Sequence, residues 1–210
     1  MSIDADTPIR ILSIAGSLRE ASMNRRLARL AARLAPDGVT LIQYEDLASV
    51  EPFDEDVEVG GFPTGAAALS ALVREHDGVL ITTPEYNGSV PGQLKNALDW
   101  LSRADGARPD KESLQASALF GVPVAVASAS DGQFGAVWSR DELVKVLRTQ
   151  GARPIAEPSV TIPKGNTAFD HGGNLLVTAQ QENLAGLVAK LAETVTVLRA
   201  ARARAAGAPT

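Results

Sequence analysis

Three polar loops, each placed where an apolar run gives way to a helical pattern, hold the residue types best suited to binding a small ligand. They read GSLREASMN (residues 16–24), TTPEYNGSVPGQLKNALDW (82–100) and SASDGQFGA (128–136). Hydroxyl, amide and guanidinium groups in such loops bind anions and polar ring edges through hydrogen bonds. Because the carboxyl ends of parallel strands meet at one edge of a sheet, we expect the three loops to converge on one ligand.

The first loop has the composition of an anion site. Gly16 permits a tight turn, Ser17 and Ser22 offer hydroxyls, Arg19 a guanidinium and Asn24 an amide, just as a helix begins. Free backbone N–H groups and the positive end of the helix favour a phosphate there. The loop lacks GxGxxG and a Walker A lysine, so one terminal phosphate fits best. The alternative stays open that Ser22 is a helix N-cap and Arg19 a solvated surface residue.

The second and third loops suit a flat heterocycle. Pro84 ends a strand, and Asn87 with Gly88 favours a turn that presents the Asn87 amide to a polar ring edge while Tyr86 covers an apolar face. The alternative is a surface turn with an exposed tyrosine. In the loop at 128–136, glycines permit close backbone approach to a ligand, or the loop is a capped helix start.

Composition excludes several other kinds of chemistry. The chain has no cysteine, which removes disulfides, thiolate metal sites and cysteine nucleophiles together. The two histidines, His76 and His171, have no partner at metal-ligand spacing, so we expect no metal site and no serine-hydrolase triad. A net charge of −5 with scattered basic residues disfavours nucleic acid, and no stretch reaches membrane-spanning length. We expect a cytoplasmic protein, and without cysteine any redox chemistry must come from a bound cofactor.

The loops are positioned by apolar runs that alternate with helical patterns. Strands are predicted at residues 9–15, 39–44, 78–83 and 122–128, with a weaker strand at 153–162. Helices are predicted at 22–35, 64–76 and 136–150, around the apolar positions of 90–101, and at 184–198 before a fraying Ala- and Arg-rich tail. This alternation indicates an α/β fold with a doubly wound, five-stranded parallel sheet. We expect one domain over residues 1–210, with a core at about 9–198, short flexible tails and irregular stretches at 45–63 and 102–117.

At the three loops the sequence resembles the NADPH-dependent FMN reductase family, and the similarity in layout runs from about residue 9 to 198. The resemblance implies a flavodoxin-like fold, a bound FMN, and NADPH or NADH as electron donor. The residues it implies for the FMN phosphate are Ser17, Arg19, Ser22 and Asn24. Those implied for the isoalloxazine ring are Pro84, Glu85, Tyr86, Asn87 and Gly88, with Ser128 and Gly132 in the third loop.

The resemblance also implies an activity and an assembly. Members pass electrons through FMN to a small acceptor such as a quinone, an azo compound, chromate or a flavin, which suggests ping-pong kinetics without a catalytic side chain in the strict sense. The family implies a homodimer or homotetramer, and the helix with Leu94, Leu98 and Trp100 suggests more apolar surface than one sheet face covers. The alternatives are a non-enzymatic flavodoxin-type electron carrier and a flavin-sensing protein on the same fold.

Overall fold

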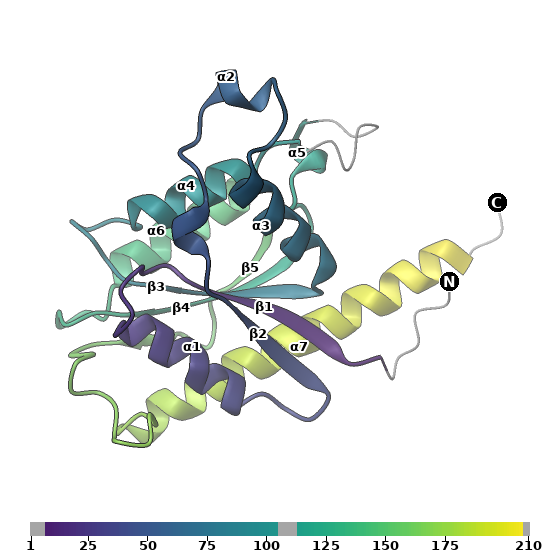
Figure 1. Ribbon diagram of the computed structural model, residues 1–210. Helices are drawn as coiled ribbons and strands as arrows, with labels where there is room; N and C mark the ends of the chain where they lie inside the picture. Colours follow the sequence, from purple (N-terminus) through teal and green to yellow (C-terminus); the bar gives the residue numbers. More distant parts are fainter. Residues whose placement is uncertain (1–6, 105–112, 208–210) are drawn as a thin grey trace.

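The computed structural model describes residues 7–104 and 113–207, and its centre is a parallel β-sheet (Figure 1). Five strands follow the order β2-β1-β3-β4-β5, and β6 also pairs with β4. Their bounds are β1 Ile9–Ala15, β2 Val39–Tyr44, β3 Gly78–Thr83, β4 Pro123–Ala129, β5 Arg153–Ile155 and β6 Thr161–Ile162. This strand order is that of flavodoxin-like folds, so the predicted fold class is confirmed.

The central strands are apolar because both of their faces are covered. Every residue of β3 and of β4 is buried, as continuous apolar runs in a parallel sheet require. The predicted bounds of the strands at 9–15, 39–44 and 78–83 are confirmed, and β4 lies one residue later than predicted. That shift of one residue changes which side chains of the third loop reach the sheet edge.

The predicted single strand at 153–162 is wrong, since the chain forms two short strands there. β5 pairs with Pro123–Ala125 and β6 with Ser128–Ala129, while residues 156–159 leave the ladder. Pro158 lies in that gap, and a proline has no N–H to donate to a β-ladder. β5 and β6 therefore share the edge of β4.

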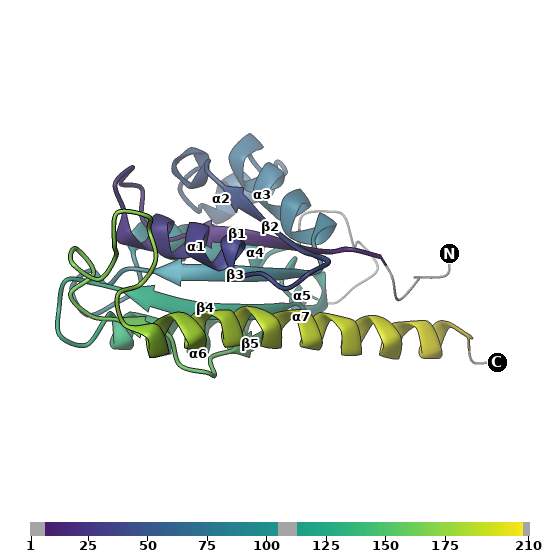
Figure 2. The same ribbon diagram turned by 90° about the horizontal axis from the view of Figure 1, so that it is seen from below.

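Helices cover both faces of the sheet, as Figures 1 and 2 show. One face is packed by α3 (Thr64–Glu75), α4 (Gly92–Leu101) and α6 (Val137–Thr149). The other is packed by α1 (Met23–Arg33) and α7 (Thr178–Gly207). Alternate residues of β1 separate accordingly, with Leu12 and Ile14 in the first core and Ile11 in the second.

Several predicted irregular or fraying segments are helical instead. The stretch at 45–63 contains η1 (Leu47–Ser49) and α2 (Glu55–Glu58), and α5 (Ser113–Ala116) lies in the stretch at 102–117, of which residues 105–112 lie outside the described part. α7 continues to Gly207 rather than ending near 198, because alanine and arginine are strong helix formers. The predicted tails include residues 1–6 and 208–210, which lie outside the described residues.

The loop at 45–63 covers the helix that was expected to expose apolar surface. Leu94, Leu98 and Trp100 of α4 are all buried. The Trp100 ring packs edge-on against Phe53 and Phe62 at centroid distances of 5.0 and 5.1 Å, and its Nε1 donates to a backbone carbonyl at 2.8 Å. α4 therefore has more apolar surface than the sheet face covers, but two aromatic residues from a distant loop bury the excess, so Leu94, Leu98 and Trp100 are not exposed for assembly.

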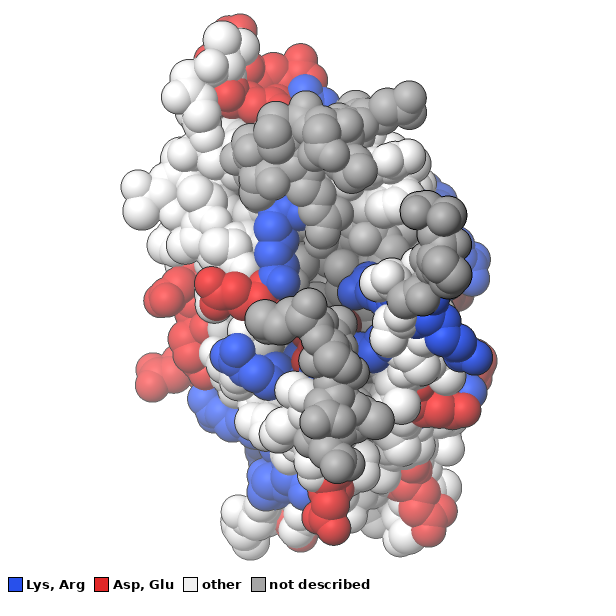
Figure 3. All heavy atoms as spheres, turned by 90° about the vertical axis from the view of Figure 1, so that its right-hand side faces the viewer, with Lys and Arg blue, Asp and Glu red and all other residues white. Residues whose placement is uncertain are grey.

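The surface carries charges of both signs. Figure 3 shows Lys and Arg beside Asp and Glu at the end of the molecule where α7 terminates. Along the described chain no helix is both long and apolar enough to cross a membrane.

Candidate functional site

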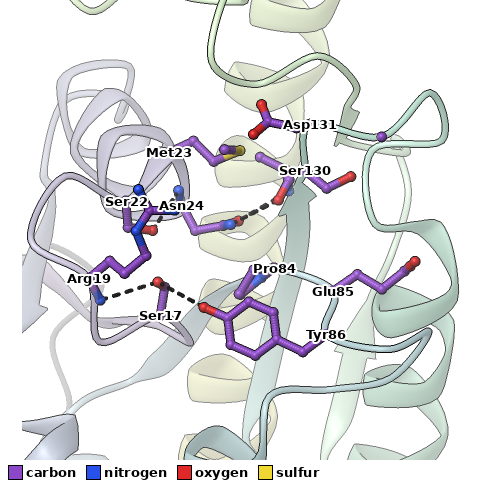
Figure 4. A pocket seen from close by; sticks show the side chains of 12 residues that line it. Ser17, Arg19, Ser22, Met23, Asn24, Pro84, Glu85, Tyr86, Ser130 and Asp131 are labelled. Carbon is purple, nitrogen blue, oxygen red and sulfur yellow. Dashed lines mark hydrogen bonds between the residues drawn. The ribbon is translucent and has the colours of Figure 1, made fainter.

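A cavity of about 400 Å³ lies at the carboxyl ends of β1, β3 and β4. This volume is within the range of roughly 300–1,000 Å³ that small-molecule and cofactor sites occupy. All three predicted loops contribute to it (Figure 4). The lining residues are Ser17, Arg19, Ser22, Met23, Asn24, Pro84, Glu85, Tyr86, Ala129, Ser130, Asp131 and Gly132.

The first loop turns sharply out of β1 because Gly16 has no side chain. A Cβ at Gly16 would lie 2.7 Å from Leu94 Cδ2, so α4 packs directly against the backbone there. The loop then brings Ser17 and Ser22 to the cavity, both nearly buried. Ser22 is the N-cap of α1, and its Oγ accepts from Asn24 N at 3.1 Å. A hydroxyl that accepts one hydrogen bond still has its proton to donate to a ligand.

Further donors in the first loop remain available to an anion. The Arg19 side chain is exposed and has no hydrogen bond or ion pair with any described residue. The Met23 N–H stands at the first position of α1, where helices lack an intrahelical partner for this group. The N-cap alternative for Ser22 is thus confirmed, and it places a helix N-terminus and a free guanidinium at the same end of the cavity.

Asn24 joins the loops through its buried side-chain amide. Its Nδ2 donates to Ala129 O at 2.9 Å, and its Oδ1 accepts from Ala129 N at 3.1 Å. Its carbonyl also accepts from Thr82 Oγ1 at 2.9 Å. One residue of α1 therefore fixes the ends of β3 and β4. The sequence predicts that the Asn24 amide binds a phosphate. In the structure, its oxygen and one of its N–H groups bond to the backbone of Ala129.

The second loop forms a tight two-residue turn over the cavity. Asn87 and Gly88 both have positive φ, at 54° and 75°, and Tyr86 and Ser89 exchange two backbone hydrogen bonds of 3.1 and 3.2 Å. Asn-Gly is the preferred pair for such turns. Tyr86 is 46% exposed and its hydroxyl lies 3.4 Å from Ser17 Oγ. Asn87 and Gly88 are at the exposed tip and do not line the cavity.

The two carboxylates that line the cavity are engaged by backbone donors. Glu85 accepts from the N–H groups of Trp138 and Ser139 at 3.2 and 3.3 Å, which places it at the N-terminus of α6. Asp131 accepts from Asn166 N at 3.0 Å. These contacts hold the two carboxylates in fixed orientations at the cavity wall.

The third loop contributes different residues from those predicted. Ser128 is fully buried, and its Oγ donates to Gly135 O at 2.6 Å, so it shapes the loop without lining the cavity. Gly132 does line it, together with three residues that the sequence reasoning missed, namely Ala129, Ser130 and Asp131. They were missed because β4 ends at Ala129, one residue beyond the predicted end, so the cavity-lining part of the loop begins one residue later than expected.

Neither histidine belongs to the cavity. His76 is nearly buried at the C-cap of α3, with its Nδ1 2.7 Å from Leu72 O. Among the residues that the structure describes, no cluster of three His, Asp or Glu side chains could hold a metal ion.

The chain is similar to known NAD(P)H-dependent flavoenzymes. It is 36% identical over 168 residues to an NAD(P)H-dependent FMN reductase of Pseudomonas aeruginosa, covering 80% of this chain and 85% of that one. It is 38% identical over 140 residues to a quinone reductase of Escherichia coli K12, covering 66% and 69%. Among solved structures, the flavoenzyme FerB, an NAD(P)H:acceptor oxidoreductase of Paracoccus denitrificans, has a TM-score of 0.76 at 26% identity, covering 89% of this chain and 97% of that one.

A family model described as NADPH-dependent FMN reductase matches residues 9–167, a range that contains all three loops. This match confirms the resemblance seen in the sequence, with FMN as cofactor and a nicotinamide nucleotide as donor. The chain therefore belongs to the NADPH-dependent FMN reductase family.

Proposed function

We propose that the cavity at the ends of β1, β3 and β4 binds one FMN, with its phosphate at the start of α1 and its isoalloxazine ring beside the turn at 84–88. The observation that carries the proposal is the pairing of an anion site and a ring platform in one cavity. The first has the free Arg19 guanidinium and the Met23 N–H, and the second has Tyr86. Backbone N–H groups at a helix N-terminus favour a phosphate.

The donor set fits a phosphate in chemistry as well as in position. Ser22 keeps a hydroxyl proton to donate, and Ser17 shares one hydrogen bond with the Tyr86 hydroxyl. Both side chains are sheltered from solvent, where a hydrogen bond to an anion is stronger than in water. Glu85 and Asp131 are held by other donors, so Arg19 is the charged group on the cavity wall without a partner in the described chain. One N–H of the Asn24 amide holds the loop in shape through Ala129, and the second has no partner among the described residues and is assigned to the phosphate.

The chain's own part in catalysis is then to bind, orient and cover. Bound FMN supplies the redox chemistry, accepting hydride from NAD(P)H and passing electrons to the acceptor. Tyr86 and Pro84 offer apolar surface for ring packing, and Asn87 and Gly88 set the shape of the turn that carries Tyr86. We assign no side chain as a catalytic acid, base or nucleophile.

We further propose a quinone, an azo compound, chromate or a free flavin as the acceptor, in a ping-pong scheme. The nicotinamide donor and the acceptor would use the open side of the cavity in turn. A quinone is favoured, because relatives covering two thirds or more of this chain are named quinone reductases. We place the activity in the cytoplasm, where NAD(P)H is available, and in a homodimer or homotetramer.

The experiment is steady-state NAD(P)H oxidation by the FMN-loaded protein with a panel of quinones, azo dyes, chromate and free flavin. Varying NADPH at several fixed quinone concentrations should give parallel double-reciprocal lines. Intersecting lines would contradict the ping-pong scheme, and turnover that is absent with every acceptor would contradict the acceptor classes. A protein that cannot be loaded with FMN would contradict the proposed site.

A further inference from the structure

Two carboxylates cross in opposite directions between α6 and the turn that carries Tyr86. Glu85, at the start of the turn, accepts from Trp138 N and Ser139 N on α6. Glu142, one turn further along α6, accepts from Ser89 Oγ at 2.6 Å and from Val90 N at 3.2 Å at the end of the turn. Each end of the turn is therefore tied to the same helix by a side-chain carboxylate.

The two attachments differ in their position relative to the cavity. Glu85 lines the cavity, whereas Glu142 does not and contacts only the far end of the turn. Helix α6 is a firm anchor because Leu143 and Leu147, on its inner face, are fully buried. The tip of the turn is exposed at Asn87 and Gly88, and an exposed segment with few buried contacts opens locally at low free-energy cost.

From this geometry we infer that Glu142 is a positioning residue that holds the Tyr86 turn in the conformation that binds the flavin ring. The inference rests on the proposed FMN site. Tyr86 stands between the two attachments, and its hydroxyl lies 3.4 Å from Ser17 Oγ across the cavity. Freeing the end of the turn lowers the fraction of molecules in the binding-competent conformation, and the apparent affinity for the flavin falls in proportion to that fraction.

The electrostatics of Glu142 agree with this role. The Ser89 hydroxyl and the Val90 N–H lower its pKa, and the ammonium groups of Lys145 on α6 and Lys95 on α4 lower it further. The carboxylate is therefore charged at neutral pH and makes charge-assisted hydrogen bonds, which are about twice as strong as neutral ones. Glutamine at this position keeps an acceptor oxygen of the same reach but not the charge.

The test is titration of FMN and of riboflavin into apoprotein carrying E142A, E142Q, S89A or the double change S89A/E142A. E142A should weaken both ligands by about the same factor, near tenfold, because it acts at the ring end of the site rather than the phosphate end. E142Q keeps the acceptor but loses the charge, so it should recover about half of the lost binding free energy and bind both ligands about threefold more weakly than the wild type. S89A should weaken both ligands about threefold, and the double variant should bind no worse than E142A, since both changes break one interaction.

The control is E182A, which removes an exposed carboxylate of α7 that has no side-chain partner in the described part of the chain. It should bind as the wild type does. Wild-type affinity in E142A, or effects of S89A and E142A that multiply, would overturn the inference while leaving the FMN site standing. Failure of the wild-type protein to bind FMN would overturn the proposed function itself. If E142A does not fold, E142Q and S89A decide, and equal, wild-type affinity in both overturns the inference.

Discussion

Replacing Arg19 with alanine removes the unpaired cation that lies just before α1. It removes no contact that stabilises the fold. The side chain is exposed and makes no hydrogen bond or ion pair with any described residue, so the change should leave the unfolding temperature of the apoprotein unaltered. Its effect should appear only when a phosphate is present.

The magnitude follows from the exposure of the side chain. A hydrogen bond to a charged group contributes about 1.5–3 kcal/mol, and solvent screening of an exposed guanidinium favours the lower end. A loss of about 1.5 kcal/mol corresponds to roughly tenfold weaker FMN binding. Riboflavin, which has the same ring without the phosphate, should bind R19A and the wild type equally.

The assay is calorimetric or fluorescence titration of both ligands at two salt concentrations. Arg29→Ala is the matched control, because Arg29, within α1, is likewise an exposed arginine without a side-chain partner among the described residues. R29A should bind both ligands like the wild type, and added salt should narrow the difference between R19A and the wild type. Equal losses for FMN and riboflavin, or no loss for either, would refute the phosphate site at α1.

Three other predictions concern the turn, the pH dependence of stability and the assembly. Asn87→Gly should preserve the turn and FMN reduction by NADPH, whereas Asn87→Ala should destabilise the protein by about 1 kcal/mol in thermal unfolding, because Asn87 has positive φ; equal stability of the two variants would contradict this. Glu51 accepts from Gly65 N and Ala66 N, which lowers its pKa, so its contribution is present above the ordinary value of 4.5 and is lost as pH falls through the lowered pKa. The free energy of unfolding of the Glu51→Gln variant should therefore be about 1 kcal/mol below that of the wild type at pH 7, and this difference should shrink in acid. Denaturant titrations that give the same difference between the two proteins at every pH would count against this. Light scattering at micromolar concentration should show a dimer or tetramer, and a fully active monomer would disprove the assembly.

Much of the fold could be predicted because its signals are local. Continuous apolar runs such as Gly78–Thr83 belong to strands buried on both faces, and their bounds were predicted correctly. The interruption of the edge strand after Arg153 was missed, although Pro158, which has no N–H to donate to a ladder, was the signal for it. The cover over Trp100 also escaped prediction, since Phe53 and Phe62 reach it from a loop whose path no periodicity describes.

The candidate site was predicted in its loops more accurately than in its individual contacts. Residue types placed Ser17, Arg19 and Tyr86 at a shared edge, and all three line one cavity. The role of Asn24 was not predictable, because its partner Ala129 is 105 positions away. The residue type of Asn87 predicts a turn, but only the structure shows that Asn87 lies at the exposed tip and outside the cavity lining.

The measurement that tests the central claim most directly is anaerobic addition of NADPH to the FMN-loaded protein, followed by its visible absorbance. The yellow absorbance should bleach with one equivalent of NADPH per bound FMN, and it should return when a quinone is added. FMN-loaded protein whose absorbance responds to dithionite but to neither NADPH nor NADH would contradict the assignment of the cavity as a site of NAD(P)H oxidation.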